Sequence, residues 1–245
     1  MDLTDKTVLV TGAAKRIGSA IARRLASLGA HVAVHYCSSK AQADETVDAI
    51  RQLGREALSI QGDLSVREEA VRVADEALQW RGELAVLVNN AATFPRAVFG
   101  ETMEKDWEDP LSTNLLAPFW LSQAIAPHFA EAGAGKIINI TDISSQSPWT
   151  TRLPYCASKA ALVSLTIGLA KELAPQVQVN AISPGPVLFP DDYTKKQHLD
   201  VIERTLLKRA GSPEDVADAV DFFCRSDFVT GVVLPVDGGQ SLPGS

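Results

Sequence analysis

The sequence predicts a doubly wound α/β fold, with one parallel sheet of about seven strands and helices on both faces. Short β-branched runs alternate with segments of helical periodicity from one end of the chain to the other. Such alternation favours parallel strands joined by right-handed crossovers. The strand segments are almost continuously apolar, as expected where both faces of a sheet are covered. No Pro-, Ser- or Gly-rich linker interrupts the pattern, so residues 1–245 are interpreted as a single domain.

Each element follows from its own residues. The segment KTVLVTG (6–12) is apolar and β-branched, which predicts a buried strand. Apolar residues then recur at helical spacing from Ile17 to Leu28, until Gly29 ends the helix. By the same criteria the further strands are 31–36, 56–63, 83–91, 135–142, 177–183 and 231–239, and the further helices are 40–53, 66–80, 102–131 and 154–174. The proline-containing segment after the sixth strand predicts a substrate loop at about 186–210.

Composition excludes several classes of function. A net charge of −7 argues against a nucleic-acid surface, which needs clustered Lys and Arg. Cys37, Cys156 and Cys224 fit neither a disulfide framework nor a metal site, and the four histidines are scattered. No segment resembles a signal peptide, and no apolar stretch approaches the ~20 residues of a membrane span. We therefore expect a cytoplasmic protein without metal, nucleic-acid or membrane partners.

A glycine turn, VTGAAKRIGSAI, lies between the first strand and the first helix. Gly12 would make the tight turn, and Gly18 would let the helix approach the strand. The helix N-terminus would then face a pyrophosphate with free N–H groups and a positive dipole. This position in a doubly wound sheet predicts a dinucleotide site.

The charges after the second strand indicate which dinucleotide binds. An NAD site usually places Asp or Glu there to hold the ribose hydroxyls. This chain has no acid before Asp44 and instead offers cations and hydroxyls for a 2′-phosphate, namely Arg16, Ser38, Ser39 and Lys40. The pattern predicts NADP(H), the alternative being that Arg16 and Lys40 are solvated surface charges.

Motifs along nearly the whole chain resemble the short-chain dehydrogenase/reductase family. They are TGAAKRIG with Arg16 in place of the middle glycine, GDLS at 62–65, NNAA at 89–92, Asn114 in LSTNLLAPF, the Tyr155/Lys159 pair, SPG and VDGG. The resemblance implies a Rossmann-type fold and a homotetramer in which helices 102–131 and 154–174 form an interface. It implies a cofactor site made of Gly12, Arg16, Ile17, Gly18, His35, Tyr36, Ser38, Ser39, Asp63, Leu64, Asn90, Ala91, Tyr155, Lys159, Pro184, Gly185 and Val187, with Val187 holding the carboxamide through its backbone.

Tyr155 and Lys159 are four residues apart and share one helix face. A phenol ionises near pH 10, and a nearby ammonium favours its phenolate. The resemblance implies that Tyr155 exchanges the proton, that Lys159 lowers its pKa and binds the nicotinamide ribose, and that Asn114 holds a relay water. The alternative is a surface pair on an amphipathic helix.

Asp142 stands thirteen residues before Tyr155, where the family usually has a serine. An ionised carboxylate opposes the negative charge that ketone reduction builds on oxygen. It tolerates protonation of nitrogen and accepts hydrogen bonds from ring N–H and amino groups. Asp142 therefore predicts a nitrogen heterocycle as substrate, unless Ser144 or Ser145 takes the place of the serine.

A second resemblance, to pteridine and dihydropterin reductases, agrees with this interpretation. It rests on Arg16, on the His35–Tyr36 strand end and on the Asp142–Tyr155 spacing. It implies that Phe94 stacks on the pterin and that Arg16 reaches the pterin edge. Such enzymes carry an arginine where this chain has Ser38, which is a departure. We expect an NADPH-dependent reductase of a pterin-like small molecule; the alternatives are a carbonyl or 3-oxoacyl-thioester reductase and a non-catalytic NADP(H) sensor.

Overall fold

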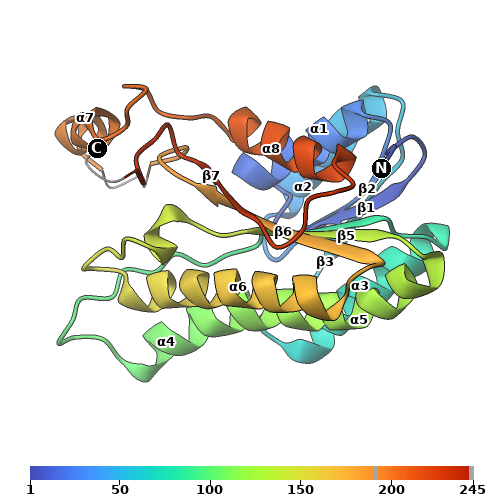
Figure 1. Cartoon of the computed structure of the whole chain (residues 1–245), viewed down its shortest axis with the longest axis horizontal. Helices are drawn as coiled ribbons and strands as arrows, with labels where there is room; N and C mark the ends of the chain where they lie inside the picture. The colour runs from blue at the N-terminus through green and yellow to red at the C-terminus, as the bar shows by residue number, and fades with distance from the viewer. Residues whose placement is uncertain (190–192, 243–245) are drawn as a thin grey trace.

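The computed structural model describes residues 1–189 and 193–242. Its centre is a seven-stranded parallel sheet in the order β3-β2-β1-β4-β5-β6-β7 (Figure 1). The strands are β1 Thr7–Val10, β2 His31–Tyr36, β3 Ala57–Gln61, β4 Val86–Asn89, β5 Gly135–Ile140, β6 Val177–Pro184 and β7 Val233–Val236. The predicted fold class is confirmed.

Helices cover both faces of the sheet (Figure 1). One layer holds α1 Arg16–Ser27, α2 Lys40–Gln52 and α8 Pro213–Arg225. The other holds α3 Arg67–Arg81, α4 Glu104–Leu111, α5 Ala117–Ala132 and α6 Leu153–Glu172. α7 Lys195–Glu203 lies in a lobe at one end of the sheet. In β1, Val8 and Val10 pack into the core under the first layer and Leu9 into the core under the second. Alternate residues of the strand therefore serve opposite faces, which explains the continuous apolar runs.

Three regions differ from the predicted elements. The substrate loop predicted at about 186–210 contains α7, and residues 190–192 of it lie outside the described residues. The single helix expected at 102–131 is α4, a π turn at Ser112–Leu116 and α5. The helix α8 was not predicted, although Ser212 and Asp215 form a capping box at its start. That spacing, a serine followed three residues later by an acid before an apolar run, is a recognisable helix start signal.

By length and composition alone, α6 is long and apolar enough to cross a membrane. In the structure it packs against β6, and it buries Pro154, Tyr155 and Lys159. The buried Lys159 ammonium faces the sheet, where it donates to Ile140 O of β5. α6 is therefore a core helix, and what it contributes is the placement of Tyr155 and Lys159.

Candidate active site

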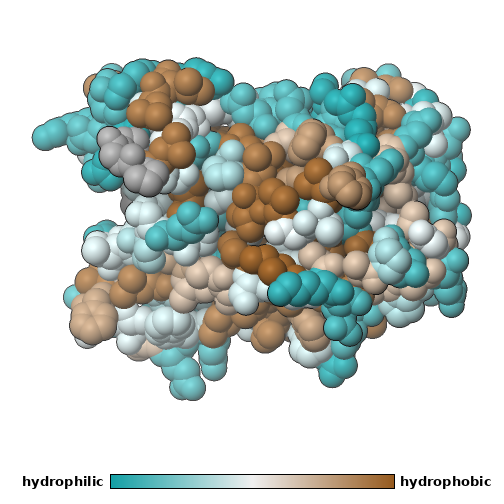
Figure 2. Space-filling model, viewed as in Figure 1, coloured by the Kyte–Doolittle hydropathy of each residue, from teal (hydrophilic) through white to brown (hydrophobic). Residues whose placement is uncertain are grey.

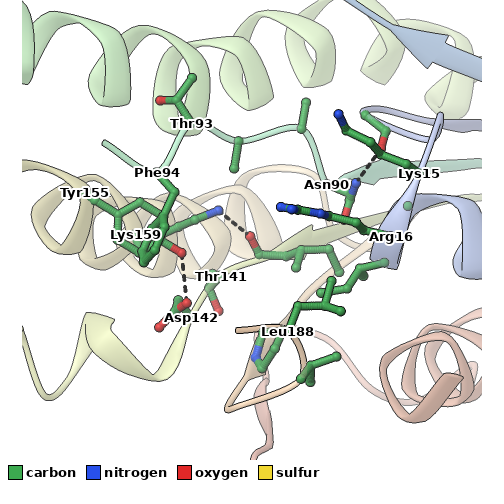
Figure 3. A pocket seen from close by; sticks show the side chains of 18 of the residues that line it. Lys15, Arg16, Asn90, Thr93, Phe94, Thr141, Asp142, Tyr155, Lys159 and Leu188 are labelled. Carbon is green, nitrogen blue, oxygen red and sulfur yellow. Dashed lines mark hydrogen bonds between the residues drawn. The ribbon is translucent and has the colours of Figure 1, made fainter. Parts of the chain in front are cut away.

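A cavity of about 650 Å³ opens where the strand order reverses, at the carboxyl ends of β1 and β4. This is where doubly wound sheets bind ligands. Figure 3 shows Lys15, Arg16 and Asn90 toward one end, and Phe94, Tyr155 and Asp142 toward the other. All seventeen residues of the predicted cofactor site line the cavity, as do Phe94 and Asp142. Asn114 and Lys40 are not among the lining residues.

The glycine turn leaves no room for a side chain at Gly12 or at Gly18. Gly12 has a φ of 60°, and a Cβ there would lie 2.9 Å from Ala91 Cα. At Gly18 a Cβ would lie 2.2 Å from Gly12 O and 2.6 Å from Asn90 Nδ2. Asn90 Nδ2 also donates to Thr11 O at 2.8 Å, which joins the turn to the end of β4. Backbone is thus exposed to the cavity at the start of α1, a cradle that fits a pyrophosphate.

Arg16 takes a left-handed conformation, with a φ of 56°, at the position where the resembled motif has glycine. Its side chain points into the cavity, which Ser38 and Ser39 also line (Figure 3). Lys40 does not join them. Its ammonium, exposed on the surface of α2, forms an ion pair with Asp44 at 2.9 Å, and its expected part in a 2′-phosphate site stays a prediction.

His35 fastens the glycine turn to β3. The backbone N–H of Gly12 donates to His35 Nδ1 at 3.1 Å, so the Nε2–H faces Gly62 O at 3.1 Å. Burial lowers the pKa of His35 to about 4, which keeps the imidazole neutral at pH 7. His35 lines the cavity as predicted, and its two hydrogen bonds give it a structural part that the sequence did not suggest.

Asp142 faces Tyr155 directly (Figure 3). The phenol donates to Asp142 Oδ2 at 2.8 Å, and the backbone N–H of Ser144 donates to Oδ1 at 2.7 Å. Burial raises the pKa of Asp142. The side chains of Ser144 and Ser145 do not line the cavity, so neither replaces the family's serine. The carboxylate itself occupies that position.

The pKa of Tyr155 is raised well above its ordinary value, first by burial and then by the Asp142 charge. This net direction is opposite to the one expected. The Lys159 ammonium lies 5.9 Å from the centre of the Tyr155 ring and donates to Ile140 O at 2.8 Å, and its expected effect on the Tyr155 pKa stays a prediction. Burial lowers the pKa of Lys159 to about 8. The phenol is therefore neutral near pH 7 and holds a proton.

Asn114 lies in the π turn and is fully buried. Its Oδ1 accepts from Thr93 N at 2.8 Å, and its Nδ2 donates to Thr93 O at 3.1 Å and to Ser158 Oγ at 3.0 Å. The side chain thus holds the loop that carries Phe94. The part expected for Asn114 in a water relay stays a prediction.

Aromatic side chains form one wall of the cavity. The Phe94 ring meets the Tyr155 ring edge-on, with 4.5 Å between centroids. Trp149 lies parallel to Tyr155 at 6.4 Å. Cys156 is buried outside the cavity, where its Sγ accepts from Trp149 N. The backbone N–H of Val187 is bonded to Gly185 O at 2.8 Å, so only its carbonyl is left for the predicted contact with a carboxamide.

Comparisons with known proteins agree with this geometry. The model of the short chain dehydrogenase family matches residues 6–198. An uncharacterized oxidoreductase from Methylorubrum extorquens is 37% identical, over 97% of this chain and 98% of the relative. A 3-oxoacyl-acyl-carrier-protein reductase from Staphylococcus epidermidis is 34% identical, over 97% of this chain and 100% of the relative. The crystal structure of a blue fluorescent protein from a metagenomic library, in complex with NADPH, has a TM-score of 0.89 and 34% identity, and covers 98% of this chain and 99% of that chain. The chain therefore belongs to the short-chain dehydrogenase family.

Proposed function

We propose that the protein is an NADPH-dependent reductase of a pterin-like heterocycle, of the dihydropterin or dihydrofolate type. The single observation that carries the proposal is the half-buried Asp142 carboxyl group, hydrogen-bonded to Tyr155 on the cavity wall. A carbonyl substrate at Tyr155 would bring developing negative charge beside this group. A pterin instead offers ring N–H and amino donors that a carboxylate accepts.

The residues present also suit the cofactor. Gly12 and Gly18 would hold the pyrophosphate, Arg16 with Ser38 and Ser39 the 2′-phosphate, and Lys159 the nicotinamide ribose. Bound NADPH supplies hydride chemistry. The NADPH complex of the metagenomic relative supports this choice of cofactor.

The chain's own residues would handle the proton. Tyr155, neutral because of burial and the Asp142 charge, carries the proton that the reduced nitrogen takes up. Asp142 orients the phenol through their 2.8 Å hydrogen bond and would accept hydrogen bonds from the substrate's donors. Phe94, edge-on to Tyr155, would serve as the flat wall for a flat ring.

A substrate panel tests the proposal. NADPH and NADH oxidation is followed with 7,8-dihydrobiopterin, dihydrofolate, an acetoacetyl thioester and simple ketones. We expect turnover of the pterins with NADPH. Rapid turnover of the thioester or ketones with no pterin activity would overturn the pterin assignment and favour a 3-oxoacyl reductase, the activity named for the Staphylococcus epidermidis relative.

Two variants sharpen the panel. Asp142→Ser restores the residue usual in the family, and we expect pterin turnover to fall about 100-fold while thioester activity is unchanged or gained. Tyr155→Phe removes the proton donor. It should abolish turnover without weakening NADPH binding in an enzyme, whereas a nucleotide sensor would have no turnover to lose. The cytoplasmic location and the absence of nucleic-acid and membrane partners stay predictions.

A further inference from the structure

Arg152 lies directly behind the aromatic wall. It is the N-cap residue of α6 and is 9% exposed. Its Nη1 donates to Phe94 O at 2.7 Å, and its guanidinium carbon lies 3.8 Å from the centroid of the Phe94 ring. The backbone joins the same two segments, since Ala97 N donates to Thr151 O at 2.8 Å. One side chain thus holds both the backbone and the ring of Phe94.

The charge of Arg152 has no anionic partner among residues 1–189 and 193–242, where the ion pairs join other side chains. Buried charges are normally paired, because removing a charge from water is costly. Here the compensation is one carbonyl and one aromatic face. A hydrogen bond from a charged donor and a cation–π contact shielded from water are both stronger than their neutral or exposed counterparts. Both contacts go to Phe94.

Arg152 lies outside the cavity, so its contacts with Phe94 act on the cavity wall and not directly on a ligand. Phe94, Trp149 and Tyr155 line the cavity, and Arg152 does not. Phe94 is 39% exposed and sits on a loop, so its own surroundings do not fix it. The neighbouring Thr93 is fixed through Asn114, but that contact restrains the backbone only. The ring contacts the Arg152 guanidinium and the Tyr155 ring, and it meets the Trp149 ring edge-on at 5.8 Å between centroids; Arg152 is the one of these three that also bonds the Phe94 backbone.

We propose that Arg152 is a positioning residue, which clamps Phe94 edge-on to Tyr155 and so sets the width of the substrate slot. The clamp acts through Phe94, without contact between Arg152 and the substrate. It does not depend on the substrate being a pterin, because it follows from the wall that any substrate reaching Tyr155 must pass. The Arg152 charge also lowers the pKa of Tyr155, against the larger upward effects of burial and Asp142.

The first test uses Arg152→Met, which keeps length and apolar volume, and Arg152→Lys, which keeps the charge without the planar fork. Arg67→Met is the matched control, since Arg67 lies 4.5 Å over the Trp120 ring between α3 and α5, and neither residue lines the cavity. Near-UV circular dichroism sums the signals of the packed aromatic side chains, Phe94, Trp149 and Tyr155 among them, and needs no substrate. We expect Arg152→Met to lose part of the native signal. The spectrum of Trp149→Phe shows which part of the signal comes from Trp149. An unchanged spectrum in Arg152→Met overturns the proposal.

The second test is kinetic, with whichever of 7,8-dihydrobiopterin and the acetoacetyl thioester the native protein reduces. We expect Arg152→Met to raise KM about 10-fold with kcat within about 3-fold, Arg152→Lys to lie in between, and Arg67→Met to match the native protein. In a Phe94→Leu background, Arg152→Met should add less than 2-fold. Independent, multiplying effects of the two substitutions would overturn the clamp. Failure of both substrates would instead count against the proposed function, and the dichroism would still decide on Arg152.

Discussion

At Arg16 an ordinary side chain occupies the left-handed region, with a φ of 56°. This conformation costs a residue with a Cβ about 1 kcal/mol relative to glycine. Backbone strain of this size persists where the side chain is needed, and Arg16 points into the cavity (Figure 3). The strain and the placement together favour a cofactor role for the guanidinium.

Arg16→Gly should therefore separate strain from binding. We expect the dissociation constant for NADPH to rise about 10- to 100-fold, as for a lost charge-assisted contact to phosphate. Stability should change by no more than about 1 kcal/mol, because relief of strain offsets the flexibility of glycine in the unfolded chain. NADPH fluorescence titration and urea unfolding measure the two. Arg23→Ala, on the exposed side of α1, should leave the affinity unchanged; equal affinities in Arg16→Gly and the native protein would contradict the assignment.

Lys159 and Asp142 should together set the alkaline limb of activity. The pKa of Lys159 is about 8, lowered by burial and raised in part by the Asp142 charge. If the ammonium is the active form, kcat/KM falls as pH rises through about 8, since this ratio reports the free enzyme. Asp142→Asn removes the charge that raises the pKa of Lys159, so the alkaline limb of this variant should lie at lower pH than that of the native protein. Residual activity of the variant across pH 6–10 measures it, with Asp44→Asn as the surface control. A limb that does not move would exclude Lys159 as its source.

The strand and helix pattern predicted most elements because the strands are short, mostly apolar runs set between segments of helical spacing. Where tertiary contacts determine how a helix is interrupted, the sequence was less informative. The break between α4 and α5 coincides with Asn114, whose side chain is bonded to Thr93 and Ser158. Local helical spacing carries no sign of such partners. Arg152 and Phe94 are likewise 58 residues apart in the chain, and no motif joins them.

The link between β2 and the glycine turn should be sensitive to acid. The pKa of His35 is about 4 in the folded protein and about 6.5 in the unfolded chain, so the unfolded state binds the proton first. The free energy of unfolding should fall as pH drops below 6.5, by about 2 kcal/mol at pH 4.5. Urea unfolding at pH 7 and pH 4.5 measures this, and the loss should be smaller by that amount in His35→Gln. Equal losses in the two proteins would show that His35 binds its proton without cost.

At the scale of the molecule, the site is assembled by topology. The residues of the site lie far apart in the chain, as Gly12, Asn90, Tyr155 and Gly185 illustrate. They come together because the carboxyl ends of the parallel strands lie at one edge of the sheet. Motif order along the chain was therefore sufficient to predict the seventeen cofactor-site residues, Phe94 and Asp142, whereas other lining residues such as Lys15, Thr93 and Arg204 were missed because no motif marks them. It could not predict how they bond there, and the direction of the Tyr155 pKa shift was wrong for that reason. Hydrogen bonds between side chains depend on distances of a few tenths of an ångström that no spacing encodes.

The structure has an exposed apolar surface that is a candidate interface for the predicted homotetramer. β7 is an edge strand, and apolar atoms gather across the middle of the face that carries β7, α6 and α8 (Figure 2). These elements carry exposed apolar side chains: Ile167 on α6, Phe222 on α8 and Val232 just before β7, with exposed fractions of 40%, 48% and 40%. Exposed apolar surface beside an unpaired strand edge is typical of a surface that another chain covers.

We expect light scattering after gel filtration to give the mass of four chains at micromolar concentration. The double substitution Phe222→Glu with Val232→Asp should reduce this to two chains, because burying two unpaired carboxylates costs several kcal/mol and an interface of ordinary size has little surplus to offset it. Leu53→Glu, equally exposed at the end of α2, should leave four chains. A native protein of one-chain mass would contradict the assembly. A double variant that still forms four chains would place the contacts elsewhere, on α4, α5 and α6 alone.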